Sequence, residues 1–444
     1  MALTDSSSAH HAHHEGLVGS GPPPAGGQGS RVALGPTGAR SLGRALRHRN
    51  YRLFFSGQSI SLIGTWLTRV ATSWLIYRLT GSAVLLGVLG FAGQIPTFFL
   101  APLAGVLVDR WDRYRVLVVT QILAMVQSAL LAGLALAGVI TVWHVLALSV
   151  FQGLINAFDM PARQSMVVEM VEDRADLPNA IALNSSMVNA ARLLGPAIAG
   201  VVIAAVGEGW CFFVDALSYG AVITSLLLMR LTVRPRAARS TRVLGEMAEG
   251  FRYVVGSVPI RSVLLLLSIV SLMGVPYMVL LPVIAREVLG GGPGTLGMLT
   301  AASGLGALGS ALYLASRRSV VGLDRVIVGA AALFGAGLVL FSRAGVLWLA
   351  LPLMLVTGVG MMLQTAASMT LVQTLVDEDK RGRVMGLVAT AYFGTLPFGS
   401  LLAGVLASRI GAENTILAGG LVVCVAAAFF FRALPRLEPV LAGE

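Results

Sequence analysis

Charged side chains are scarce in this sequence, and their scarcity argues against a water-soluble fold. The chain has 444 residues, of which 12% are charged and 56% are hydrophobic. Soluble domains carry roughly 25% charged residues and a smaller apolar share. An apolar excess of this size requires a bilayer as the solvent for much of the surface. The composition therefore predicts a membrane protein.

The sequence also lacks the motifs of several function classes. It has no Gly-rich loop that ends in Lys, which argues against an ATPase. Neither an H-E-x-x-H nor a G-x-S-x-G pattern occurs, which argues against a hydrolase. The two cysteines, Cys211 and Cys424, lie in separate apolar runs without metal-ligand spacing. We therefore expect no enzyme activity, no cofactor and no metal site.

Apolar stretches of about twenty residues recur from Tyr51 onward, the length that crosses a bilayer core. No apolar signal-peptide core precedes them, so we expect the first span to act as its own insertion signal. We place twelve spans near residues 53–78, 83–107, 116–138, 142–167, 179–205, 210–230, 260–284, 294–315, 325–342, 346–373, 384–408 and 412–432. The predicted fold is an all-α polytopic membrane protein with two pseudo-symmetric six-helix bundles.

Positive charge is distributed unevenly between the loops of this arrangement. If the N-terminal tail is cytoplasmic, 26 of the 32 basic residues lie on the cytoplasmic side and 4 on the opposite side. Cytoplasmic loops of membrane proteins collect Lys and Arg. The bias predicts that both termini are cytoplasmic, in the inner membrane of the cell. It also explains the net charge of +11 without any nucleic acid as partner.

The loops divide the chain into five parts. We expect a disordered cytoplasmic tail at 1–45, an N-terminal bundle at 46–230, a cytoplasmic linker at 231–259, a C-terminal bundle at 260–433 and a cytoplasmic tail at 434–444. Residues 244–255 of the linker are amphipathic at helical spacing, which predicts a helix on the inner membrane surface. Four histidines in the first tail could chelate a metal, although a solvated tail is the favoured interpretation.

Small residues suggest that the two halves are related by duplication. Three glycine pairs are separated by 204 positions: Gly105 with Gly309, Gly195 with Gly399, and Gly200 with Gly404. A parallel duplication of six spans is a transporter architecture, with the substrate site between the halves near the middle of the bilayer.

Residues 105–115, at the end of the second span, resemble the G-x-x-x-D-R-x-x-R signature of the major facilitator superfamily. The resemblance implies a conformational latch formed by Gly105, Asp109, Arg110 and Arg113. Asp109 and Arg113 are four residues apart at a helix end, where they can pair and cap facing helix termini. Gly105 would allow another helix to approach closely.

Two positions depart from this signature. Asp112 stands where Gly is usual, and Tyr114 stands where a basic residue is usual. In the second half, Tyr313 occupies the position expected for the latch aspartate. We therefore expect a latch in the first half only.

The fifth predicted span carries a second signature. Gly195, Pro196 and Gly200 are similar to the Gly-Pro motif of superfamily antiporters, with Ala199 in place of one glycine. Proline kinks a span, and small neighbours allow helices to pivot at short range. Ordinary helix packing is the alternative interpretation.

Segments 156–164, 179–185 and 381–386 resemble the branch that contains enterobactin-type siderophore exporters and macrolide efflux proteins. The resemblance covers roughly residues 45–432. It implies proton-coupled export of an amphiphilic small molecule by alternating access.

Ionisable residues inside the spans are candidates for proton coupling, because a charge in the bilayer costs at least ~2.5–3.5 kcal/mol unless it is paired or hydrated. They all lie in the first half: Arg69, Asp159, Arg163, Arg192 and Asp215. Asp159 and Arg163 could instead form a structural pair, since they are four residues apart. Asp215 could be an interfacial anchor, about one turn from the outer surface.

The second half offers Met, aromatic and amide side chains, which suit an adaptable pocket. We expect substrate contacts from Gln94, Asn156, Asn184, Tyr277, Met361, Gln364 and Phe393. Packing or lipid exposure is the alternative for most individual side chains.

The sequence thus favours a secondary active transporter whose partners are a small molecule, protons and membrane lipid, and we expect a monomer. Inward transport of a lysophospholipid or nutrient is a second hypothesis. A membrane sensor or scaffold without transport is a third, although it would need a folded domain outside the bilayer, and the sequence offers only tails and a short loop.

Overall fold

The computed structural model describes residues 43–171, 173–230, 243–317, 319 and 321–433. All regular structure in these ranges is helical. The helices of the first half are α1 (Arg49–Thr80), α2 (Ala83–Arg110), α3 (Arg113–Leu136), α4 (Val142–Met170), α5 (Leu177–Val206) and α6 (Glu208–Leu227). Those that follow are α7 (Val243–Gly256), α8 (Val258–Ile269), α9 (Tyr277–Val283), α10 (Pro293–Ser316), α11 (Leu323–Phe341), α12 (Leu347–Leu375), α13 (Arg381–Phe393), α14 (Leu396–Ile410) and α15 (Ala412–Ala433).

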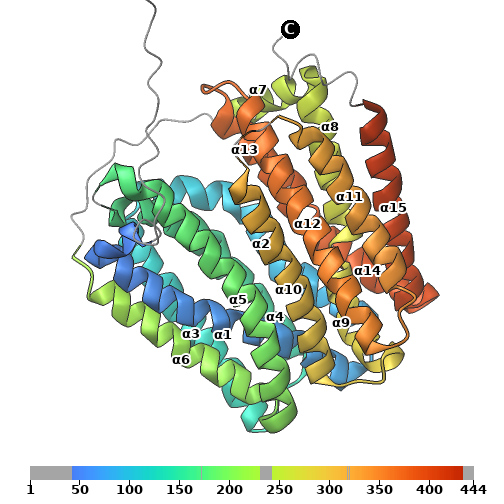
Figure 1. The fold of residues 1–444 in the computed structure, drawn as a ribbon. Coiled ribbons are helices and arrows are strands. Elements are labelled where there is room, and N and C mark those ends of the chain that lie inside the picture. The colour runs from blue at the N-terminus through green and yellow to red at the C-terminus, as the bar shows by residue number, and fades with distance from the viewer. Residues whose placement is uncertain (1–42, 172, 231–242, 318, 320, 434–444) are drawn as a thin grey trace, which may run out of the picture. The chain divides into compact units, whose positions relative to one another are not determined.

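The predicted all-helical membrane fold is confirmed. Within the described ranges, 11 helical stretches are long and apolar enough to cross a membrane, and α1, with 32 residues, packs against α5 and α6 as the remaining long helix. Figure 1 shows the helices in two groups, coloured blue to green for the first half and yellow to red for the second. The chain is therefore a polytopic α-helical membrane protein built from two halves.

Two of the spans are broken, which the sequence prediction did not anticipate. The seventh span, Val258–Val288, contains two π-helical turns at Val270–Gly274 and Ile284–Val288, with α9 between them. Pro276 lies between the first turn and α9, and proline supplies no backbone N–H for a helical hydrogen bond. The eleventh span is divided into α13 and α14 near Gly394. Breaks of this kind are common at functional sites.

The two halves meet at two close helix crossings, α5 with α10 and α2 with α14. At the first crossing, a Cβ atom added to Gly297 would lie 2.6 Å from the carbonyl oxygen of Pro196. At the second, a Cβ atom added to Gly404 would lie 2.6 Å from the carbonyl oxygen of Ala83. Only glycine permits backbones to approach this closely. Gly200, which the sequence pairs with Gly404, faces Gly297 across the first crossing.

Contacts between the halves concentrate toward the end of the helices that is remote from the Arg-rich loops. On α2 they run from Ala83 to Phe98, whereas the helix continues to Arg110. At the same end, the hydroxyl of Tyr77 on α1 donates a hydrogen bond to the carboxylate of Glu287 in the second half. The halves are therefore joined at the end opposite the Arg-rich loops.

A helix occurs where the linker was predicted to be amphipathic. This helix, α7, packs against α13 and α8 of the second half, and Glu249 forms an ion pair of 2.8 Å with Arg383. The Tyr253 hydroxyl donates to Asp377 at 3.3 Å. The hydrogen bond from Lys380 to the same carboxylate raises the pKa of Lys380. Polar contacts thus hold α7 on the Arg-rich end of the second half.

Substitution of Gly404 tests the close crossing of α2 and α14. We expect Gly404→Ala to lower the free energy of unfolding by about 1–3 kcal/mol, because the new methyl group overlaps the Ala83 carbonyl. The measurement is thermal unfolding of the purified protein in detergent. Gly220→Ala is the matched control, since a Cβ atom there meets nothing within 4 Å. Equal melting temperatures for the two variants would contradict the account.

Candidate functional site

Asp159 lies on α4 at the centre of a buried polar cluster. The residue is 4% exposed, and its Oδ2 atom forms an ion pair with Arg163 one turn later. Its Oδ1 atom accepts hydrogen bonds from Gln121 Nε2 at 2.6 Å and Thr120 Oγ1 at 3.0 Å. The predicted pair therefore exists, and α3 supplies two further partners that the sequence did not identify.

Asp215 is buried within the first half and does not act as an interfacial anchor. It is 1% exposed on α6, and its Oδ2 atom accepts hydrogen bonds from Ser128 at 2.7 Å and Thr68 at 2.8 Å. Its Oδ1 atom has no hydrogen-bond partner among the described residues. Gly64 on α1 explains this depth, because a Cβ atom there would lie 2.6 Å from Oδ1. The anchor interpretation is therefore wrong: α1, α3 and α6 enclose this carboxyl.

Tyr219 lies between the two acidic residues. It is buried one turn beyond Asp215 on α6, and it packs with Ala124 and Ile155. Electrostatic interactions reach it from Asp215, Asp159 and Arg163. The sequence analysis missed this tyrosine and the α3 partners. Polar residues at 120, 121, 127 and 128, inside an otherwise apolar stretch and at roughly helical spacing, were the available signal.

The other two predicted coupling residues, Arg69 and Arg192, lie on α1 and α5, and Arg69 is within electrostatic range of Tyr219. Arg69 on α1 is exposed, and its guanidinium stacks over the Trp66 ring at 4.7 Å. Arg192 on α5 is half-buried, and its Nη2 atom lies 3.9 Å from the sulfur of Met361 on α12. Arg192 therefore lies at the seam between the halves.

Some of the predicted substrate contacts gather at the same seam. Met361 contacts Arg192, and the buried Tyr277 lies within electrostatic range of Arg192. The Tyr277 hydroxyl forms a hydrogen bond of 3.0 Å with the Ser303 hydroxyl. Gln364 is 0% exposed and bonds its own-helix neighbour Ser368 at 3.4 Å. Gln364 is therefore a packed side chain in this state.

The remaining predicted contacts lie on four different helices. Gln94 donates to the carbonyl of Gly90 at 3.0 Å, and Asn156 accepts from Gln152 at 3.1 Å, each within its own helix. Asn184 on α5 is half-buried, and Phe393 at the end of α13 is exposed and lies edge-on to Tyr392. The structure does not gather these four residues around Arg192.

The predicted latch is open at its glycine. A Cβ atom added to Gly105 would meet nothing within 4 Å, and the residue borders a pocket of about 420 Å³. The expected close approach of another helix is therefore absent at Gly105. Arg113 forms an ion pair of 3.0 Å with Glu169 on α4. Arg110 is exposed at the end of α2, and the side chain of Asp109 lies outside the described residues.

The two departures from the family signature have local structural roles. Asp112 caps α3, since its carboxylate accepts hydrogen bonds from the backbone N–H groups of Tyr114 at 3.0 Å and Arg115 at 3.3 Å. The Tyr114 hydroxyl donates to the carbonyl of Leu226 at 3.1 Å, which ties α3 to α6. Both residues therefore fix the start of α3.

The antiporter-like motif lies directly at a helix crossing. A Cβ atom on Gly195 would overlap Trp66 of α1, while Pro196 and Gly200 form the contact with α10. The motif thus contacts α1 of its own half and α10 of the other half.

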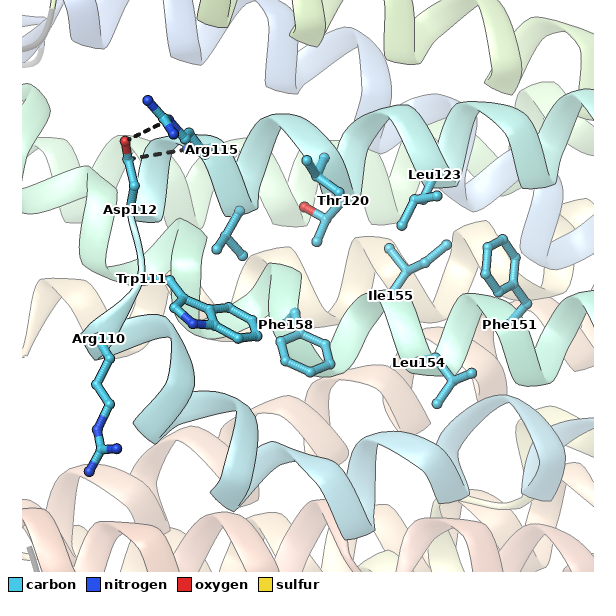
Figure 2. A pocket seen from close by; sticks show the side chains of 12 residues that line it. Arg110, Trp111, Asp112, Arg115, Thr120, Leu123, Phe151, Leu154, Ile155 and Phe158 are labelled. Atoms are coloured by element: carbon cyan, nitrogen blue, oxygen red, sulfur yellow. Dashed lines mark hydrogen bonds and ion pairs between the residues drawn. The ribbon is translucent and has the colours of Figure 1, made fainter.

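A groove of about 740 Å³ opens between α3, α4 and the end of α2. Figure 2 shows apolar side chains along most of it and the Asp112–Arg115 pair at one end. Trp111 and Phe158 stack in its wall, with ring centroids 6.3 Å apart. Thr120 also lines it, and the same hydroxyl bonds Asp159. The groove is therefore separated from Asp159 by one side chain.

Across the described parts of the chain, no group of three or more His, Cys, Asp or Glu residues could hold a metal ion. The histidine cluster of the tail lies outside those residues.

Two halves of membrane-spanning helices, with hydrogen-bonded buried carboxyls in the first half and a seam between the halves, define a secondary transporter of the major facilitator class. The chain belongs to the transmembrane secretion effector family, whose model matches residues 42–441. It is 25% identical to the staphyloferrin A transporter of Staphylococcus aureus, over 86% of this chain and 95% of that protein. It is 28% identical to the multidrug efflux pump Tap of Mycolicibacterium fortuitum, over 84% and 93%.

Further similarities agree with this assignment. Macrolide efflux protein A of Streptococcus pyogenes is 23% identical, over 86% of this chain and 96% of that protein. A bacterial homologue of the lysosomal transporter Spinster, solved in an inward-facing and unoccupied conformation, superposes with a TM-score of 0.70 at 14% identity. The superposition covers 91% of this chain and 99% of the chain in that structure. The likeness shows the fold.

Loss of one partner tests the Asp159–Arg163 pair. We expect Arg163→Gln to destabilise the protein by up to ~3 kcal/mol, because it leaves a buried carboxylate without its cation. This value is an upper bound, since the Arg163 side chain is 28% exposed and solvent screens part of the interaction. The double variant with Asp159→Asn should recover most of that stability, since no unpaired charge remains. Thermal unfolding of the single and double variants gives the coupling. Additive losses in the double variant would contradict the pair.

Proposed function

We propose that this transporter exports an amphiphilic small molecule from the cytoplasm and is driven by protons. Support comes from the efflux proteins among its relatives and from the buried carboxyls of the first half. We propose a monomer in the cytoplasmic membrane with both termini inside, surrounded by lipid and acting by transport without catalysis. The Arg-rich loops support this orientation.

The environment of Asp215 carries the proposal of proton coupling. This carboxyl is enclosed by three helices, accepts hydrogen bonds only from hydroxyl groups, and leaves one buried oxygen without a partner. An ionised carboxylate without a cation is costly in such surroundings. A proton removes that cost, so binding and release of a proton would change the packing of α1, α3 and α6.

Asp159 is the second candidate for the proton. Its ion pair with Arg163 already neutralises its charge, which favours a structural role. Tyr219, which is within electrostatic range of both carboxyls, supports coupling between the two sites. We therefore assign the transported proton to Asp215 and a positioning role to Asp159 and Arg163.

The contacts between the halves support an alternating-access cycle. In this structure the halves touch at the end that bears Tyr77 and Glu287, and Gly105 at the other end of α2 faces open space. If the Arg-rich loops are cytoplasmic, this is an inward-facing arrangement. The latch residues Gly105, Asp109, Arg110 and Arg113 would then form contacts with the second half in the outward-facing state.

Neutralisation of each carboxyl tests the proton assignment. We expect Asp215→Asn to abolish uphill transport while exchange of labelled for unlabelled substrate continues, because only the proton step is removed. Transport of radiolabelled erythromycin, ethidium and 4-phenylbutyrate, which differ in charge, into proteoliposomes with an imposed pH gradient gives both rates. Asp159→Asn should retain some uphill transport. A full substrate gradient built by Asp215→Asn would contradict the assignment.

A further inference from the structure

Arg69 and Arg192 lie within membrane-spanning helices, and the carboxyls of the proposed proton site do not serve as their counter-ions. Among the described residues, neither arginine has a carboxylate within ion-pair distance, and the two lie within electrostatic range of each other. The carboxyls of the first half do not compensate them, since Asp159 pairs with Arg163 and Asp215 bonds to hydroxyls. Two like charges in a bilayer-spanning domain are costly unless an anion or water accompanies them.

The position of Arg192 connects this charge to the second half. Its side chain contacts Met361, and its backbone carbonyl is packed so tightly on α10 that a Cβ atom on Gly304 would lie 2.8 Å away. Tyr277 and Tyr392 of the second half are also within its electrostatic range. Arg69 is exposed although it lies in the middle of α1 and near this seam.

We propose that Arg69 and Arg192 bind an anionic group of the transported molecule at the seam between the halves. This inference rests on the proposed transport function and specifies the class of its substrate. Arg offers a planar fork of donors that matches a carboxylate or phosphate. The anion would relieve the repulsion between the two cations, and the guanidinium of Arg69 is held in place by the Trp66 ring.

The surrounding side chains define the rest of the ligand. Trp66 contacts Arg69 with its ring and Met361 contacts Arg192 with its thioether, while Tyr277 and Tyr392 lie within electrostatic range of Arg192. Such side chains accept aromatic and other apolar groups of varied shape. The expected substrate is therefore an amphiphile with at least one carboxylate, phosphate or similar anion beside an apolar or aromatic part.

Three compounds with the same skeleton and different charges test the assignment. They are radiolabelled 4-phenylbutyrate, 4-phenylbutyramide and 4-phenylbutylamine, and citrate and inorganic phosphate serve as competitors. Equilibrium binding to the full-length protein in phosphatidylcholine nanodiscs gives the affinities. We expect the wild-type protein to bind 4-phenylbutyrate, citrate or inorganic phosphate at least ~10-fold more tightly than the amide or the amine.

Variants at the two arginines then locate the binding. Arg192→Gln and Arg69→Gln should each weaken anion binding ~10-fold and leave amide binding unchanged, while Arg192→Lys should retain part of the preference. Arg409→Gln is the control, because it removes the same charge from an exposed position at the end of α14. The proposal is overturned if no anion in the set distinguishes wild type from Arg192→Gln, or if Arg409→Gln has the same effect.

Two further comparisons separate this inference from its alternatives. Nanodiscs that contain phosphatidylglycerol test a lipid headgroup as the anion, and loss of 4-phenylbutyrate binding there would overturn the substrate assignment in favour of lipid. Asp215→Asn should retain the anion preference, because its carboxyl lies outside the seam. If proton-driven transport fails in every assay while the preference persists, the proton proposal is wrong and the anion site stands.

Discussion

Contact of backbone with backbone at two helix crossings is the constraint on which the rest of this structure depends. At both crossings a glycine lies against the carbonyl oxygen of a helix in the other half. The two halves share a bilayer in which apolar side chains gain nothing by leaving lipid, so close packing of small residues must supply the association. Because the crossings cover one end of the helices, they leave the other end free to separate, which is the geometry that a rocking transporter needs.

The same constraint explains why the buried carboxyls of the first half take their hydrogen-bond partners from that half. A carboxyl in the bilayer requires hydrogen-bond donors that do not move away from it during the cycle. Asp215 obtains them from α1 and α3, which belong to its own half. Asp159 obtains them from α3 and from its own helix. Both sites can therefore remain intact while the halves move, whereas Arg192 changes surroundings because it contacts Met361 of the opposite half.

Features with a local cause were predictable from the sequence. The spans follow from apolar length, and the Asp159–Arg163 pair follows from a spacing of four residues on one helix. The enclosure of Asp215 was not predictable, because its partners Thr68 and Ser128 lie 147 and 87 residues away on other helices. The open space at Gly105 has a similar origin, since it depends on which state of the transport cycle the halves adopt.

Distances between spin labels at the two ends of the helices test the central claim most directly. One pair joins residues 186 and 374 near the Arg-rich end, and the other joins residues 79 and 409 at the opposite end, in a variant with Cys211 and Cys424 replaced by serine. Double electron–electron resonance is measured in nanodiscs across pH, with and without substrate. Alternating access predicts that the first distance shortens as the second lengthens. If each of the two label pairs gave one distance that stayed the same under every condition, the account would be contradicted.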